Sequence, residues 1–288
     1  MRESVNLLLS VFKVRIGFAI MLCAIAGMAV TPGTGLPAWQ ALALAVAVLL
    51  SSASAGAFNQ YMERDLDARM KRTRNRPFVT GRYRAGAFWL SGIGAMLLVA
   101  VAAAAMATNA VAALYVFLGA FTYGVVYTLW LKRRTPWNIV WGGLAGSFAV
   151  LAGAAAVDPG LSPLPVILAG VLFLWTPPHF WSLAFMFRDD YSRAGVPMLP
   201  AVVDARVATQ IILAHTIALV VLSLVPAAFG AGWLYMTGAA VGGAYFVWRS
   251  VALLRSPGPV TAMANFRASL LQLTLLLAAA IIDGWMLT

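Results

Sequence analysis

Long apolar stretches recur along the whole chain, separated by short polar connections. A membrane-spanning helix needs about 20 mostly apolar residues, and nine stretches come close to that length or exceed it. They cover 14–30, 38–58, 86–106, 109–130, 138–156, 163–187, 207–229, 231–250 and 268–287. The pattern predicts an all-α polytopic membrane protein with about nine transmembrane helices, built as one domain over 1–288.

Basic residues fall on one side of this predicted topology. All 20 Lys and Arg lie before or at the start of the first stretch, or in and beside every second connection after it, while the alternate connections and the C-terminus hold none. Because Lys and Arg collect on the cytoplasmic side of a membrane, the pattern predicts a cytoplasmic N-terminus and an outside C-terminus. We therefore expect an integral protein of a bacterial inner membrane, with its charged loops facing the cytoplasm.

Composition excludes several other classes of protein. Hydrophobic residues make up 62% of the chain and charged residues only 10%, whereas soluble domains carry roughly a quarter charged residues. The single cysteine, Cys23, excludes an intrachain disulfide. A net charge of +11 would suggest nucleic acid for a soluble protein. Confined to membrane-flanking loops, the charge predicts a lipid bilayer around the protein and no nucleic-acid partner.

An acidic stripe follows the second apolar stretch. Asn59, Glu63 and Asp67 are spaced i, i+4 and i+8, so on a helix they line one face over about 12 Å. Asp65 would point to nearly the opposite side. Oxygen ligands on one face suit a hard cation such as Mg²⁺, which usually binds through one or two carboxylates plus substrate phosphates.

The same connection, 59–84, is rich in basic residues, among them Arg74 and Arg76. Guanidinium groups bind phosphate oxygens in a fork-like geometry, so acids beside arginines predict a Mg²⁺–diphosphate site. Two alternatives remain open: the basic residues set topology or contact anionic lipids, and Glu63 pairs with an arginine on a solvated helix end. A transporter would place ionisable groups within its spans, which here are almost free of charge.

The sixth stretch contains two adjacent prolines, Pro177 and Pro178. Proline removes a helical hydrogen bond, so we expect the helix to kink or to restart here, with Thr176 as the cap of the new start. His179 follows directly. It is either a hydrogen-bonded packing residue or part of a cavity shaped by the prolines and their aromatic neighbours.

A second acidic motif occupies the connection 188–206, where Asp189 and Asp190 are adjacent. Acids thus follow the second and the sixth stretches, four spans apart. This spacing indicates two related four-helix halves followed by a ninth helix.

Three blocks of sequence resemble the UbiA superfamily of intramembrane prenyltransferases, and within it the protoheme IX farnesyltransferase branch. The blocks are 59–77 with its Thr-Arg-Asn-Arg-Pro string, 127–143, and 175–200 with its Pro-Pro-His-Phe and Ala-Gly-Val-Pro-Met-Leu-Pro strings. One departure is Glu63, which stands where the superfamily usually has Asp. The resemblance implies a UbiA-like helical bundle around a central cavity.

This resemblance also implies an activity, the transfer of a farnesyl group from farnesyl diphosphate to a vinyl group of haem b, giving haem O for terminal oxidases. It assigns Mg²⁺ and the catalytic positions to Asn59, Glu63, Asp67 and Asp190, with Asp189 as a further candidate ligand. It assigns diphosphate binding to Arg74, Arg76, Lys132, Arg133 and Tyr127, and haem binding or orientation to His179. An oxidase-assembly factor or a haem A synthase is an expected partner.

Two other functions stay open at this point. One is a UbiA-type prenyltransferase that acts on a quinone precursor or another aromatic acceptor. The other is a haem-handling transporter without catalytic activity.

Overall fold

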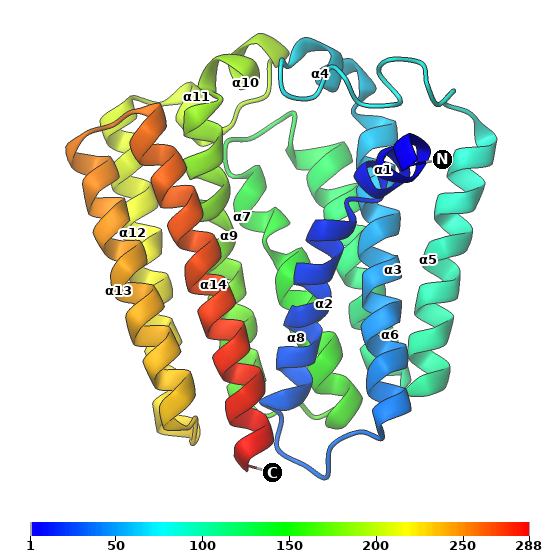
Figure 1. Cartoon of the computed structure of the whole chain (residues 1–288), viewed down its shortest axis with the longest axis vertical. Coiled ribbons are helices and arrows are strands. Elements are labelled where there is room, and N and C mark those ends of the chain that lie inside the picture. Colours follow the sequence, from blue (N-terminus) through cyan, green and yellow to red (C-terminus); the bar gives the residue numbers. More distant parts are fainter. Residues whose placement is uncertain (1, 288) are drawn as a thin grey trace.

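The computed structural model describes residues 2–287, and helices account for most of that range, with no strand in it (Figure 1). The first half contains α1 (Arg2–Val11), α2 (Val14–Ala29), α3 (Ala38–Met62), α4 (Arg64–Arg69), α5 (Ala87–Ala107), α6 (Ala110–Phe121), η1 (Thr122–Leu131), α7 (Asn138–Gly142) and α8 (Leu144–Val157). The second half contains α9 (Pro163–Met186), α10 (Arg188–Ala194), α11 (Leu199–Val202), α12 (Ala205–Leu224), η2 (Val225–Phe229), α13 (Trp233–Arg255) and α14 (Pro259–Leu287).

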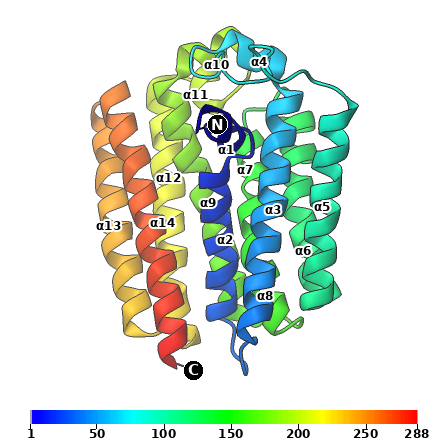
Figure 2. The same ribbon diagram turned by 45° about the vertical axis from the view of Figure 1, so that its right-hand side comes forward.

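The long helices run side by side along one axis and form a single bundle (Figures 1 and 2). Within the described range, seven helices are long and apolar enough to cross a membrane, or eight if the bent pair α1–α2 counts as one span. The helix α13, predicted as the eighth span, is not among them, although it packs between α12 and α14. The all-α polytopic class is confirmed, and the count of nine and the membrane orientation stay predictions.

Three short helices, α4, α10 and α11, lie together across one end of the bundle (Figures 1 and 2). The N-terminus lies toward the same end, and the C-terminus lies at the opposite end. Both acidic motifs predicted from the sequence are therefore on one end of the molecule, above the long helices.

Of the two outcomes expected at the prolines of α9, a kink or a restart, the restart is wrong, and the kink stays a prediction. The helix is continuous through Pro177 and Pro178, and the Thr176 hydroxyl donates to the Leu172 carbonyl, 3.0 Å away, instead of capping a new helix. Helix-breaking residues are tolerated in membrane helices where neighbours compensate for the lost hydrogen bonds. Gly143 packs closely at this level of α9: a Cβ atom there would lie only 3.2 Å from the Phe173 carbonyl oxygen, the acceptor whose helical donor Pro177 lacks.

The last helix begins earlier than predicted. The sequence predicts a span from 268, whereas α14 begins at Pro259 and runs for 29 residues. Hydropathy detects only the apolar part of a helix, so the sequence prediction did not include the more polar turns between Pro259 and 268. Arg267, expected in a connection, is an exposed residue of this helix, while Asn265 beside it is fully buried.

A backbone contact joins α2 to α8. A Cβ atom at Gly27 would lie 2.1 Å from the Val150 carbonyl oxygen, and one at Gly153 would lie 1.9 Å from the Ala24 carbonyl oxygen. Small residues let membrane helices approach this closely. The two helices therefore meet backbone to backbone.

Candidate active site

The two acidic motifs contact each other although they are far apart in the sequence. The backbone N–H of Arg72 donates to Oδ2 of Asp190, 3.3 Å away and 118 positions along the chain. Each motif follows a break in a long helix, at Glu63 after α3 and at Phe187 after α9. His179 and Asp190 therefore lie on different helices, α9 and α10.

Glu63 is almost completely buried, with 1% of its surface exposed. Its Oε2 accepts a hydrogen bond of 2.5 Å from Nζ of Lys132, while its Oε1 is buried without a partner among the described residues. Burial lowers the pKa of Lys132, but the adjacent carboxylate outweighs that effect and raises the pKa overall. Lys132 therefore carries its charge at neutral pH.

Asp67 forms a second buried ion pair on the same face. Both of its carboxylate oxygens accept from Nη1 of Arg76, at 2.8 and 2.7 Å. The Thr73 hydroxyl donates to the backbone carbonyl of Asp67 at 3.1 Å. This bond fixes the turn that brings Arg76 back over the helix end.

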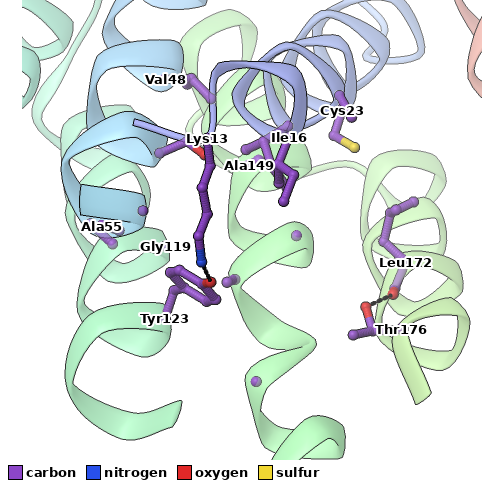
Figure 3. A pocket seen from close by; sticks show the side chains of 18 of the residues that line it. Lys13, Ile16, Cys23, Val48, Ala55, Gly119, Tyr123, Ala149, Leu172 and Thr176 are labelled. Carbon is purple, nitrogen blue, oxygen red and sulfur yellow. Dashed lines mark hydrogen bonds between the residues drawn. The ribbon is translucent and has the colours of Figure 1, made fainter. Parts of the chain in front are cut away.

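Asn59 belongs to a network that the sequence prediction missed. Its Oδ1 accepts from Nζ of Lys13 at 2.6 Å, and its Nδ2 donates to the Thr128 hydroxyl at 3.0 Å. The same Lys13 ammonium donates to the Tyr123 hydroxyl at 2.9 Å, as Figure 3 shows. Lys13 reaches this position because it occupies the left-handed break, with φ of 48°, where α1 and α2 bend.

A π-helix supplies the other members of this network. The segment η1 continues α6 with the wider i→i+5 winding, which is rare and frequent at functional sites. It carries Tyr123, Tyr127 and Thr128, and the rings of the two tyrosines stack with their centroids 5.6 Å apart. The sequence flagged only Tyr127, because apolar periodicity cannot distinguish a π-helix from an α-helix.

Asp190 is the buried acid of the second motif, and its carboxylate pairs with Arg193 one turn away. Burial raises its pKa, but hydrogen bonds from the Arg72 backbone and the Arg193 side chain outweigh this and lower the pKa overall. The neighbouring Asp189 is exposed.

Two predicted diphosphate ligands lie outside this cluster. The terminal nitrogens Nη1 and Nη2 of Arg133 donate to Asp65, at 2.7 and 2.8 Å, in a pair that is about half exposed. Hydrogen bonding to Arg133 lowers the pKa of Asp65 despite its partial burial. Arg74 is exposed on the same loop. The structure thus brings Lys132 and Arg76 to the buried acids but pairs Arg133 with a different one.

The donor set fits a hard divalent cation by its chemistry. Carboxylate and amide oxygens are the ligands that Mg²⁺ prefers, and Glu63 presents a buried oxygen without a partner. In the described part of the chain, however, no three His, Cys, Asp or Glu side chains are grouped closely enough to hold a metal ion. The buried acids are instead bound to Lys132, Arg76 and Arg193.

A cavity of about 400 Å³ opens beneath this cluster, between α2, α3, η1, α8 and α9 (Figure 3). Lys13, Tyr123 and Tyr127 form its polar lining near the acids. The rest is mainly apolar, with small residues at many positions, and includes Cys23 on α2. A volume in this range is typical of small-molecule sites.

His179 lines the same cavity from α9 and is 8% exposed. Its ring lies between Trp175 and Phe266, with centroid distances of 4.2 and 4.5 Å. The cavity therefore joins two chemically different regions, a charged end at Lys13 and a neutral aromatic wall at His179.

A charged cluster above an apolar cavity in a helical bundle is the arrangement that an intramembrane prenyltransferase needs. The sequence matches the UbiA prenyltransferase family over residues 20–277. The chain belongs to this family. It is 60% identical to protoheme IX farnesyltransferase 2 of Paramagnetospirillum magneticum, over 98% of both chains. It is 47% identical to protoheme IX farnesyltransferase 1 of the same organism, over 96% of this chain and 97% of the other.

Solved structures share the fold at low sequence identity. A digeranylgeranylglyceryl phosphate synthase structure aligns with a TM-score of 0.79 at 17% identity, over 98% of this chain and 99% of the other. A UbiA homologue from Archaeoglobus fulgidus, bound to GPP and Mg²⁺, aligns with a TM-score of 0.71 at 16% identity, over 95% and 99%. These similarities confirm the predicted UbiA-like bundle.

Proposed function

We propose that this prenyltransferase moves a farnesyl group from farnesyl diphosphate to a vinyl group of haem b, giving haem O. The observation that carries the proposal is the direct junction of a charged cluster with an apolar cavity through Lys13, Asn59 and Tyr123. One end suits a diphosphate, and the other suits an isoprenoid chain and a porphyrin. The names of the relatives that are 60% and 47% identical supply the choice of donor and acceptor.

The diphosphate binds at the charged end. When bound, Mg²⁺ supplies neutralising charge on the diphosphate oxygens, and the residues that would hold it are Asn59, Glu63, Asp67 and Asp190. Arg76 and Lys132 already lie against these acids, and Arg74 lies on the same loop. These three cations bind the diphosphate oxygens and stabilise the charge that develops as it leaves. In this proposal Arg133 stays with Asp65.

The cavity controls what happens to the farnesyl group. Breaking the allylic carbon–oxygen bond leaves the electron pair on diphosphate and gives a delocalised cation at the farnesyl carbon. The stacked rings of Tyr123 and Tyr127 present π faces that stabilise such a cation, and the apolar walls keep water away from it. A vinyl carbon of the porphyrin then forms the new carbon–carbon bond. Water adds to the resulting cation and releases a proton, which leaves a hydroxyethylfarnesyl group.

The proposal also covers the setting of the reaction. We expect the protein in a bacterial inner membrane, with the end that carries α4 and α10 in the cytoplasm, where farnesyl diphosphate is dissolved. An oxidase-assembly factor or a haem A synthase is the expected recipient of the product.

The deciding experiment is incubation of the purified protein in nanodiscs with haem b, farnesyl diphosphate and Mg²⁺, followed by haem extraction and mass analysis. We expect haem O and stoichiometric diphosphate. A parallel reaction with 4-hydroxybenzoate tests the quinone-precursor alternative, and prenylation of that acceptor alone would overturn the choice of haem. A transporter without catalysis predicts that Glu63→Gln and Asp67→Asn keep function, and intact function in both variants would overturn the enzyme.

A further inference from the structure

His179 is held so that only one edge of its ring is available. Trp175 and Phe266 cover its two faces at interplanar angles of 20° and 27°, and Phe180 meets it edge-on at 5.2 Å. Its Nδ1 lies 2.7 Å from the Ser269 hydroxyl oxygen. His179 lines the cavity, and its Nε2 has no hydrogen-bond partner among the described residues.

The partner of Ser269 determines which nitrogen of His179 carries the proton. The Ser269 hydroxyl has a single hydrogen and donates it to the Phe266 carbonyl, 2.7 Å away on the same helix. Both contacts of the hydroxyl are hydrogen bonds only when its oxygen accepts from His179, an arrangement that places the proton on Nδ1. It follows that Nε2 carries a lone pair.

Ser269 makes a second contact with α9 that positions Trp175, the indole stacked on the His179 ring. The indole N–H of Trp175 donates to the Ser269 carbonyl at 3.0 Å. Ser269 thus accepts from α9 twice, through its backbone and through its side chain. One residue of α14 sets the position of both the imidazole and the indole stacked on it.

The surroundings of Nε2 differ from those of the diphosphate end. The wall beside His179 is formed by residues such as Leu172, Leu270 and Leu273, without a charged partner among the described residues. A neutral imidazole nitrogen in such a wall suits a metal centre, because neutral imidazole is the commonest protein ligand for metals and the usual axial ligand of haem iron. Metal-bound histidines in proteins also donate their other ring N–H to an oxygen acceptor, which orients the ring and increases its basicity.

We propose that Ser269 is a positioning residue that fixes His179 with its proton on Nδ1, so that Nε2 binds the iron of the porphyrin acceptor as an axial ligand. This inference rests on the proposed function, since it requires haem b as the substrate. A bond from Nε2 of His179 to the iron would hold the porphyrin at its centre. Only its edge is then free to face the charged end, which is where a vinyl group must lie to meet the farnesyl carbon.

The experiment follows ferrous haem b bound to the protein in nanodiscs by absorption and resonance Raman spectroscopy, without farnesyl diphosphate. The wild type should show an iron–histidine stretching band. His179→Gly should lose this band, and added imidazole should restore it. Ser269→Ala should shift the band and weaken haem binding about tenfold, the lower end of the effect of removing such an outer partner, and Ser269→Thr, which keeps the hydroxyl, should behave like the wild type.

A matched control comes from Ser223. It is fully buried in α12, and its hydroxyl donates to the Val220 carbonyl at 2.7 Å, the same backbone bond that Ser269 makes. Ser223→Ala should leave the iron–histidine band and haem affinity unchanged. Identical spectra for the Ser269→Ala and Ser223→Ala proteins would overturn the role of Ser269, even if His179→Gly does not fold.

The outcomes separate this inference from the proposed function. Haem O formation by a protein whose bound haem shows no iron–histidine band, or shows an unchanged band in His179→Gly, overturns axial ligation alone. A protein that binds no haem b and prenylates another aromatic overturns both.

Discussion

The two acidic motifs have the same backbone plan and different chemistry. In each, a long helix of 24 or 25 residues breaks at a single residue and continues as a short helix of 6 or 7 residues. The break residues have similar dihedral angles, φ −96° and ψ 17° at Glu63, and φ −107° and ψ 30° at Phe187. The second motif thus carries an aromatic residue where the first carries an acid.

The partners of the acids differ as well. Glu63 pairs with Lys132, 69 positions away, and Asp67 with Arg76, 9 positions away, so folding brings their partners to them. Asp190 pairs with Arg193 on its own short helix. The first motif concentrates two buried charges and their counter-charges, and the second adds one acid with a local partner. We infer that the first motif provides most of the charge stabilisation.

The largest effect should come from neutralising the first motif. Glu63→Gln and Asp67→Asn each remove a buried charge that, in the proposed function, binds the metal–diphosphate complex. Loss of one group that stabilises developing charge costs about 10²–10³ in rate, and we expect at least that loss in haem O formation, measured by mass analysis. Asp65→Asn, which changes an exposed acid in the same motif, is the control and should retain activity. Equal losses in all three variants would contradict the assignment.

Removing the cation of the first motif should cost stability. Lys132→Met leaves the Glu63 carboxylate buried without its counter-charge, and breaking a buried pair in this way costs about 3–5 kcal/mol. We expect a clearly lower midpoint of thermal unfolding in detergent. The double variant Lys132→Met with Glu63→Gln should recover part of the loss, because it removes the stranded charge. A double variant less stable than Lys132→Met would argue against the pair.

The second motif should be less sensitive. In Asp190→Asn an amide oxygen can still accept from the Arg72 backbone, so geometry is kept and only charge is lost. We expect a smaller loss of rate than in Glu63→Gln, about 10-fold to 10²-fold, below the cost of a well-placed charge-stabilising group. Both variants should be assayed side by side under saturating haem b. A greater loss for Asp190→Asn would reverse the ranking of the motifs.

The smallest effect should come from Arg133→Gln. This arginine bonds to Asp65 in an exposed pair, and such pairs contribute about 0.2–1 kcal/mol. We expect a small change in unfolding midpoint and an unchanged KM for farnesyl diphosphate. A large rise in that KM would instead give Arg133 the diphosphate-binding role that the family resemblance implies.

Features that depend on one residue at a time were predictable from the sequence. The cost of placing a charge in hydrocarbon is a property of each side chain, so the apolar stretches and the positions of acids and bases predict a helical membrane bundle with its chemistry at one end. The stripe of Asn59, Glu63 and Asp67 follows from helical spacing, and the structure confirms that these three lie on consecutive turns at the end of α3 and the start of α4.

Features that depend on tertiary structure were not predictable. In the sequence, Lys13 is one of many basic residues that set the membrane topology. In the structure, the left-handed break between α1 and α2 turns its side chain toward Asn59. Tyr123 and Thr128 enter the site because η1 is wound as a π-helix. The helix α9 does not restart at Pro177, where Gly143 packs close to the Phe173 carbonyl oxygen, and no local pattern contains such a tertiary contact.

The glycine contact between α2 and α8 has a consequence for redesigning the acceptor range. Cys23 and Ala149 line the cavity, and each lies one helical turn from the glycine of its own helix, Gly27 or Gly153. The distance between α2 and α8, which form two walls of the cavity, is thus set by the backbone contact at these glycines, and neither glycine lines the cavity itself. Substituting smaller residues for lining side chains would enlarge the cavity by single methyl groups. A methyl group at Gly27 would instead force α2 and α8 apart along their length, because it would lie 2.1 Å from the Val150 carbonyl oxygen. To make room for a bulkier acceptor, the glycine contact is therefore a more effective position to substitute than the lining residues Cys23 and Ala149.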